Sequence, residues 1–331
     1  MSSERKNKKI RFQKRIKIRV GHLSTFYHTA ILLMAKETEG PCIFEWKLFA
    51  TGPDIVNAFR EGFIDLAYIG LPPAIIGIDR GVKIKCVAGG HIEGTVMAGA
   101  QWLKGHPDLP GFDEVLRQEK LEGKKIGVPG KGSMHEVILS DALARLGLAK
   151  NSVEVVNFKW ADAITEAMAK NDVQAAIGTP ALAVAIRRYA KGKVLVPPRL
   201  IWPGNPSYGI VASKGLIETQ PEALEFFLRR HEEATLALRE NPLECARRIS
   251  AYAGLVDEEF VLEAINMSPK YCAQLTEGYM KATMDFANAL KRLGYIGCRQ
   301  DLSREDIFET GIIRKAHPAG DHYSPLKSKN T

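Results

Sequence analysis

The 331-residue chain lacks the sequence signals of several functional classes, namely membrane-spanning, metal-binding and nucleotide-binding proteins. No apolar run approaches the roughly 20 residues that a membrane-spanning helix needs. No HExxH or CxxC spacing occurs, and His28, His91 and His135 have no clustered carboxylates beside them, so we expect no metal site. The turn at residues 130–133 fits neither nucleotide-binding glycine pattern, because no Lys directly precedes Ser133 and His135 occupies the last glycine position. We therefore expect no cofactor.

The chain has only five cysteines, which is an odd number. A disulfide framework would need paired cysteines at regular spacings, so we expect buried free thiols instead. The five cysteines are Cys42, Cys86, Cys245, Cys272 and Cys298.

Excess charge is confined to the N-terminus. The chain has 46 Lys and Arg against 38 Asp and Glu, a net charge of +8. Residues 1–20 hold nine bases and one acid, so the rest of the chain is neutral. We therefore expect no nucleic-acid partner, although the basic tail suits peripheral association with an anionic membrane surface.

An export signal is also missing from the sequence. Residues 10–20 alternate apolar and basic side chains like a strand, and no apolar signal core follows the basic start. Two alternatives stay open: the protein is cytoplasmic, or a signal is absent from this chain and the protein acts at the periplasmic or extracellular face.

What the sequence does contain is an alternation of short β-rich runs and helical runs from residue 15 to about residue 200. This pattern predicts an α/β fold with largely parallel sheets. Strands are expected at 83–87, 95–102 and 208–212, among others, and a helix at 25–39. Beyond Pro221 the pattern predicts only helices, the last at 270–293, followed by a fraying tail from 317 to 331.

The alternating pattern repeats once. Ile69-Gly70-Leu71-Pro72 follows the third expected strand, and Ile177-Gly178-Thr179-Pro180 follows the third strand after the restart. The repeat predicts two α/β lobes that face each other across a cleft. Several strands there lead directly into helix N-termini, whose free N–H groups and partial positive charge favour anions.

Several motifs, in order, make the chain resemble the ABC-transporter substrate-binding proteins of the nitrate/sulfonate/taurine group. That group has the type II periplasmic-binding-protein fold of the thiamine-pyrimidine-synthase-like superfamily. The resembling stretches are residues 18–21, 58–62, 65–70, 81–85, 121–128, 132–133 and 175–180.

This resemblance implies two lobes and a C-terminal helical region. Residues 15–100 with 213–316 would form lobe 1, residues 101–212 lobe 2, and residues 1–14 and 317–331 flexible ends. It also implies a monomeric solute-binding protein that delivers a small anionic ligand, such as a sulfonate, nitrate or carboxylate, to an ABC permease and its ATPase, with hinge closure trapping the ligand.

We expect the ligand-binding residues at the loops after the strands. Hydroxyls at helix starts and glycines that allow close backbone approach would hold the anion, while aromatic residues would contact an apolar part of the ligand. The candidates are Ser24, Thr25, Phe26, His28, Gly70, Leu71, Pro72, His91, Gly132, Ser133, Trp160, Gly178, Thr179 and Tyr208.

The alternative is a cytosolic enzyme on the same fold, similar to a thiamine-pyrimidine synthase or an aromatic sulfinate desulfinase. The desulfinase type implies a nucleophilic Cys in the first loop, where this chain has residues 24–28, STFYH. The pyrimidine synthase implies a cysteine-rich motif that this sequence does not contain. We therefore favour binding without catalysis.

Overall fold

The computed structural model describes residues 15–24, 32, 40–148, 152–297, 302–317 and 320–323. The basic tail before residue 15 lies outside these ranges, as does the helix expected at 25–39 except for Leu32. Within the described ranges, no helix has both the length and the apolar character needed to cross a membrane. Cys42, Cys86, Cys245 and Cys272 are buried thiols that form no disulfide with one another, as expected, while Cys298 is outside the described residues.

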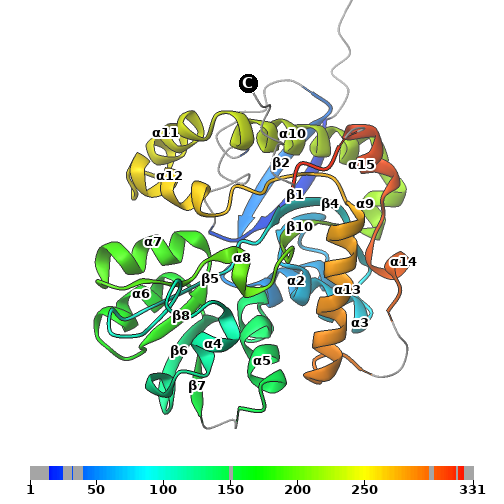
Figure 1. Cartoon of the computed structure of the whole chain (residues 1–331). Coiled ribbons are helices and arrows are strands. Elements are labelled where there is room, and N and C mark those ends of the chain that lie inside the picture. The colour runs from blue at the N-terminus through cyan, green and yellow to red at the C-terminus, as the bar shows by residue number, and fades with distance from the viewer. Residues whose placement is uncertain are drawn as a thin grey trace, which may run out of the picture.

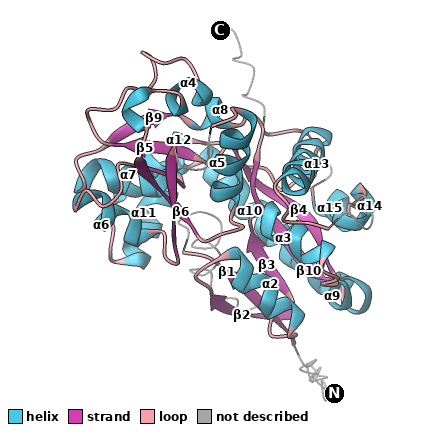
Figure 2. Cartoon of the chain, turned by 90° about the horizontal axis from the view of Figure 1, so that it is seen from below, coloured by secondary structure: helices cyan, strands magenta, loops and turns pink. Residues whose placement is uncertain are grey.

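The described part of the chain contains two five-stranded sheets (Figures 1 and 2). In spatial order, the first sheet contains β2 (Cys42–Leu48), β1 (Ile16–His22), β3 (Leu66–Ile69), β10 (Pro206–Ser213) and β4 (Ile84–Ile92). The second contains β7 (Val153–Phe158), β6 (Lys124–Pro129), β8 (Ala175–Gly178), β5 (Val96–Gly99) and β9 (Lys193–Val196).

The two sheets have equivalent strand orders, which is what the sequence repeat predicts. In each, the first strand of the repeat lies between the second and the third, followed by a strand that crosses from the other half of the chain. The prediction of largely parallel sheets is confirmed for four strands of each sheet, with one exception in each: β10 runs antiparallel to β3 and β4, and β5 runs antiparallel to β8 and β9. Each sheet thus contains one crossing strand, and that strand runs opposite to its two neighbours.

These crossing strands also shift the expected lobe boundaries. β5 was expected in lobe 1 and β10 in lobe 2, yet each pairs with the other sheet. The sequence shows that both segments are strand-like but not which partners they pair with. We propose that the chain crosses between Ile92 and Val96 and returns between Val196 and Pro206, so that lobe 2 spans residues 96–196.

Helices cover both sheets and close the structure. Those that follow the strands are α2 (Gly52–Arg60), α3 (Leu71–Asp79), α4 (Phe112–Leu116), α5 (Met134–Arg145), α6 (Asp162–Ala169), α7 (Pro180–Tyr189) and α8 (Pro198–Ile201), with a 3₁₀ turn at Glu119–Leu121. The C-terminal ones are α9 (Lys214–Thr219), α10 (Pro221–Glu240), α11 (Pro242–Ala253), α12 (Glu258–Met267), α13 (Glu277–Arg292), α14 (Arg304–Ile307) and α15 (Gly311–Ala316). In Figure 1, α10 lies across the top of the first sheet, α11 and α12 lie to its left above α7, and α13 runs down its right side.

Two expectations about the C-terminal region need correction. The helix expected from residue 270 begins only at Glu277, because the Thr276 hydroxyl caps it and residues 270–274 are extended against the edge of β4. There the Gly89 N–H donates to the Ala273 carbonyl at 2.8 Å.

The described part of the expected fraying tail is packed rather than loose. His317 and Tyr323 are 3% and 6% exposed, and the Tyr323 hydroxyl donates to the Cys272 carbonyl at 2.7 Å. Burial of these aromatic rings holds the segment against the protein. Residues 324–331 are outside the described residues.

Candidate ligand-binding cleft

A cleft of about 650 Å³ lies between the two sheets. We call it the interlobe cleft. From the first sheet it is lined by residues that include Ser24, Thr51, Tyr68, Gly70, His91 and Tyr208. From the second it is lined by Ser133, His135 and Thr179 and by α6, and Leu255, Val256 and Phe260 close one side from the C-terminal helices. A volume of this size suits a small molecule.

Four helix N-termini contribute their capping residues to the interlobe cleft. Thr51, Gly70, Ser133 and Thr179 are the N-caps of α2, α3, α5 and α7. The first turn of a helix has N–H groups without partners inside the helix and carries a partial positive charge. The two lobes therefore direct positive backbone ends into one cavity, from both sides.

Side-chain hydroxyls fix these helix starts locally. The Ser133 Oγ accepts a hydrogen bond from the Glu136 N–H at 3.3 Å, and the Thr179 Oγ1 accepts one from the Leu182 N–H at 3.3 Å. Gly70 has no capping side chain, and a Cβ added there would lie 3.7 Å from the Met134 Cβ on the opposite lobe. The two lobes therefore come close together at Gly70.

An aromatic wall, which we define as Tyr68, His91 and Tyr208, forms the first-sheet side of the interlobe cleft. The Tyr208 ring lies 6.1 Å from Tyr68 and 5.9 Å from His91, between ring centroids. Behind the wall, the His91 ring stacks on Tyr271 at 4.5 Å. The wall offers apolar ring faces to a ligand.

In this wall, the His91 Nε2 and the Tyr68 hydroxyl form hydrogen bonds inside the protein. The His91 Nε2 donates to the Ser268 carbonyl at 2.6 Å. His231 donates from Nε2 to the Gly89 carbonyl, so in its neutral form its Nδ1 accepts from the Tyr68 hydroxyl at 3.0 Å. Burial lowers the pKa of His91 and of His231 to about 4 and raises the pKa of Tyr68, so these three side chains are uncharged at neutral pH.

Two residues that line the interlobe cleft, Thr165 and His135, each have a buried polar side-chain atom without a hydrogen-bond partner in the described structure, and His135 is the titratable one. It lies in the first turn of α5, and its Nε2 is buried without a hydrogen-bond partner in the described structure. Burial lowers the pKa of His135 to about 4, so the ring is neutral at physiological pH. The Nε2 of a neutral imidazole in this place can donate or accept one hydrogen bond with a bound ligand.

Among the described lining residues there is no Lys or Arg. The charged side chains at the interlobe cleft are Asp162 and Glu166 on α6, and Glu166 is paired with Lys170. An anion bound here would therefore be held by backbone N–H groups and hydroxyls rather than by a basic side chain.

The structure places the candidate residues in three groups. Ser24, Gly70, His91, Ser133, Thr179 and Tyr208 line the interlobe cleft. Five others do not line it. Leu71 and Pro72 are buried residues of α3, and Gly132 faces a second cavity beside Tyr295. Gly178 packs against the Leu182 side chain, and Trp160 is 43% exposed. Thr25, Phe26 and His28 are outside the described residues.

These five differ from the expectation for a common reason. Each is one or two positions from a residue that does line the interlobe cleft, so the sequence identifies the loops but not which position in each loop faces the cleft. The expectation also missed Thr51, although Thr51-Gly52-Pro53-Asp54 is a capping-box signal directly after a strand.

A family model described as the NMT1-like family matches residues 14–252 of this chain, well over half of its length. The chain belongs to the NMT1-like family. This NMT1-like chain is 28% identical over 272 residues to the taurine-binding periplasmic protein of Escherichia coli (strain K12), covering 78% of this chain and 80% of that protein.

Solved structures are similar to this NMT1-like chain over nearly its whole length. The alkanesulfonate-binding protein SsuA from Xanthomonas axonopodis pv. citri, solved with bound MOPS, has 17% identity and a TM-score of 0.73, with 89% of this chain and 99% of that chain covered. The periplasmic nitrate-binding protein NrtA from Synechocystis PCC 6803 has 14% identity and a TM-score of 0.74, with coverages of 96% and 93%. At these identities the likeness shows the fold, and it confirms the expected two-lobed architecture of periplasmic binding proteins.

Proposed function

We propose that the chain is a solute-binding protein that captures a small anionic ligand in the interlobe cleft and delivers it to an ABC importer. The observation that carries the proposal is the convergence of four helix N-termini, from both lobes, on one cavity. Prolines remove some first-turn N–H groups from α2, α3 and α7, and the N–H groups that remain in the four first turns suit sulfonate, nitrate or carboxylate oxygens. The taurine-, alkanesulfonate- and nitrate-binding relatives support this class of ligand.

The ligand has an anionic head and an apolar part. The head would lie at the caps Ser133 and Thr179, and the apolar part against the Tyr68 and Tyr208 rings. Because no basic side chain is among the described lining residues and two acids lie on α6, a monoanion or a zwitterion fits better than a multiply charged anion. Nitrate, which has no apolar part, would leave the aromatic wall unused.

Transport also implies partners and a location. We propose that the protein acts as a monomer at the periplasmic or extracellular face of a membrane and docks on a permease that works with an ATPase. The periplasmic relatives support this location.

The test is a binding screen with a turnover control. The purified chain is titrated with taurine and longer alkanesulfonates, nitrate, aromatic carboxylates and a thiamine-type pyrimidine. We expect one-to-one binding of a sulfonate or carboxylate, and recovery of the ligand chemically unchanged. Absence of binding in every class would contradict the proposal.

The enzyme alternative has one observation in its favour, the unpartnered Nε2 of His135 in the interlobe cleft. However, none of the described lining residues is a cysteine that could act as nucleophile. His135→Ala separates the two functions: a binding role predicts weaker affinity and unchanged ligand, whereas an enzyme would convert a ligand in the wild type and lose that turnover in the variant.

A further inference from the structure

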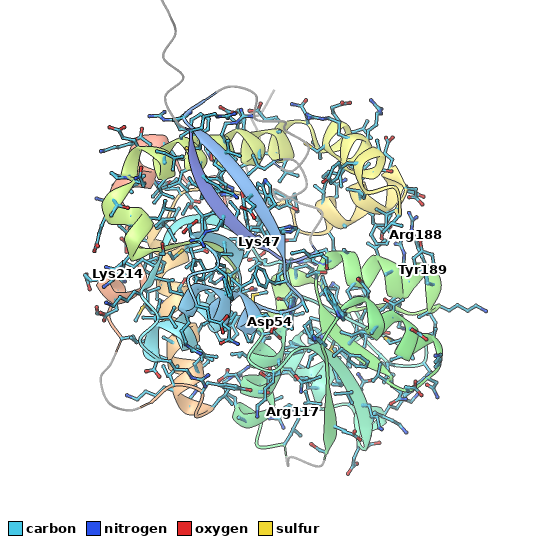
Figure 3. All side chains as sticks on the ribbon, turned by 180° about the vertical axis from the view of Figure 1, so that it is seen from behind. Lys47, Asp54, Arg117, Arg188, Tyr189 and Lys214 are labelled. Atoms are coloured by element: carbon cyan, nitrogen blue, oxygen red, sulfur yellow. The ribbon has the colours of Figure 1, made fainter. Side chains whose placement is uncertain are left out.

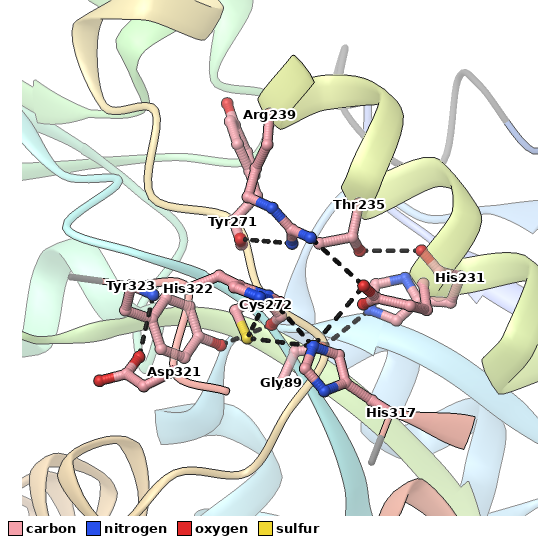
Figure 4. A network of polar contacts seen from close by, with 11 residues as sticks. Gly89, His231, Thr235, Arg239, Tyr271, Cys272, His317, Asp321, His322 and Tyr323 are labelled. Carbon is pink, nitrogen blue, oxygen red and sulfur yellow. Dashed lines mark hydrogen bonds and ion pairs between the residues drawn. The ribbon is translucent and has the colours of Figure 1, made fainter. Parts of the chain in front are cut away.

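Three side chains with metal-binding atoms meet close to Tyr271, and none of the three is among the residues that line the interlobe cleft (Figure 4). The Cys272 Sγ lies 3.8 Å from the His317 Nε2 and 3.9 Å from the His322 Nδ1, and the two nitrogens are 3.2 Å apart. Cys272 and His317 are buried and His322 is half-buried. One sulfur and two ring nitrogens thus form a compact triangle.

The triangle has the dimensions of three ligands around one zinc ion. Zinc binds Cys sulfur at about 2.3 Å and His nitrogen at about 2.0–2.1 Å, usually in tetrahedral geometry. That geometry places sulfur and nitrogen about 3.6 Å apart and two nitrogens about 3.3 Å apart. The measured separations differ from these values by a few tenths of an ångström, so an ion requires only small side-chain shifts.

A carboxylate, that of Glu232, lies beside the His317 corner of the triangle, outside the set of three mutually close ligand atoms. The Glu232 Oε1 is 3.6 Å from the His317 Nε2 and 3.3 Å from the Arg239 guanidinium. The other oxygen, Oε2, is buried and has no hydrogen-bond partner in the described structure. A buried unpaired carboxylate oxygen is costly, and coordination to a cation would satisfy it.

We propose that Cys272, His317 and His322 form a binding site for Zn²⁺, and that the Glu232 carboxylate turns toward the bound ion to fill the fourth position. A thiolate, two imidazoles and a carboxylate are the donor types that zinc takes in proteins, and they are too soft a set for Mg²⁺ or Ca²⁺. A hydrogen bond between the two histidines explains their short separation, but it explains neither the sulfur at the third corner nor the unpaired Glu232 oxygen.

The site joins two segments that lie far apart in the sequence. Cys272 belongs to the extended segment that pairs with β4, where its N–H donates to the Gly90 carbonyl. His317 and His322 follow α15. The neighbouring Tyr271 stacks on His91 of the aromatic wall, so the bound ion would fasten the C-terminal segment behind that wall.

The experiment uses the full chain after removal of any affinity tag and of bound metal by a chelator. Titration with Co²⁺ is expected to produce thiolate-to-metal charge-transfer absorption at one equivalent, and Zn²⁺ is expected to displace it and raise the Tm. His322→Ala should weaken zinc binding at least about tenfold, and Cys272→Ser should abolish the charge-transfer absorption.

Matched controls are available in this chain. His106→Ala changes an exposed histidine, and Cys245→Ser changes a buried free thiol, and both should bind zinc as the wild type does. His322 is half-buried, so its variant can be tested even if Cys272→Ser fails to fold. The proposal is overturned if Co²⁺ gives no thiolate absorption in the wild type, or if His322→Ala and His106→Ala bind zinc equally well.

Discussion

Ser133 combines two roles that a pair of matched variants can separate. Its hydroxyl caps α5 at the interlobe cleft, and the Ser213 hydroxyl caps α9 in the same way, away from the cleft, by accepting from the Leu216 N–H. Replacing either by Ala should cost about 0.5–2 kcal/mol of stability. Only Ser133→Ala should also weaken ligand binding, at least about tenfold, because the Ser133 hydroxyl can turn its proton from the Pro129 carbonyl, to which it donates at 3.3 Å, to a bound anion. Calorimetry and thermal melts give both quantities, and equal affinities of the two variants would contradict the assignment.

Buried neutral histidines predict how stability depends on pH. Burial lowers the pKa of His91, His135 and His231 from 6.5 to about 4 in the folded protein. The unfolded chain therefore takes up protons first, so their contribution is complete above pH 6.5 and is lost as the pH falls toward 4. We expect the Tm to decline over this window.

The variant His135→Gln tests how much of the decline in Tm is due to His135. His135→Gln removes one of the three buried groups, so its Tm should fall less steeply between pH 6.5 and 5, whereas the exposed His106→Gln should follow the wild type. A wild-type Tm that stays flat over this range would show that these histidines are not held neutral by folding.

At the scale of elements, α7 of the second lobe is joined to the C-terminal helices by ion pairs. Arg188 binds Asp257 at 2.7 Å and Glu259 at 3.1 Å and lies over the Phe260 ring, while Arg187 pairs with Glu263. Figure 3 shows Arg188 at the end of α7, directed toward α12. Phe260 lines the interlobe cleft, so these contacts hold one side of the cleft closed.

Breaking this connection should favour the open form. Exposed pairs contribute up to about 1 kcal/mol, so Arg188→Ala should weaken ligand affinity about two- to fivefold with little change in Tm. Arg229→Ala is the control, because Arg229 pairs with Glu225 inside α10. Small-angle scattering should show a more open unliganded form for Arg188→Ala alone, and unchanged affinity would argue against the closing role.

The sequence predicted elements better than it predicted their partners. Capping and strand signals around Gly70, Ser133 and Thr179 are local, and the structure has those helix starts where they were expected. Sheet membership of β5 and β10 depends on pairing between distant strands, which no local pattern encodes. The same limit hid the cluster at Cys272, because its histidines are 45 and 50 residues further along the chain.

At the scale of the whole molecule, the residues that give the chain its positive net charge are not the residues that line the interlobe cleft. The +8 arises from the first 20 residues, while the described lining of the interlobe cleft has no basic side chain. Deleting residues 1–14 should therefore leave ligand affinity unchanged and abolish any salt-sensitive binding to vesicles of anionic phospholipid. A loss of ligand affinity in the truncated chain would instead connect the tail to the cleft.

The central claim is that helix N-termini in the interlobe cleft hold an anion. The most direct measurement is calorimetry of the full chain with an aromatic or alkyl sulfonate and with the matching neutral sulfone. We predict one-to-one binding of the sulfonate, at least about tenfold weaker binding of the sulfone, and weakening of the sulfonate alone by Ser133→Ala. Equal affinity for the charged and neutral compounds, or no binding of either, would contradict it.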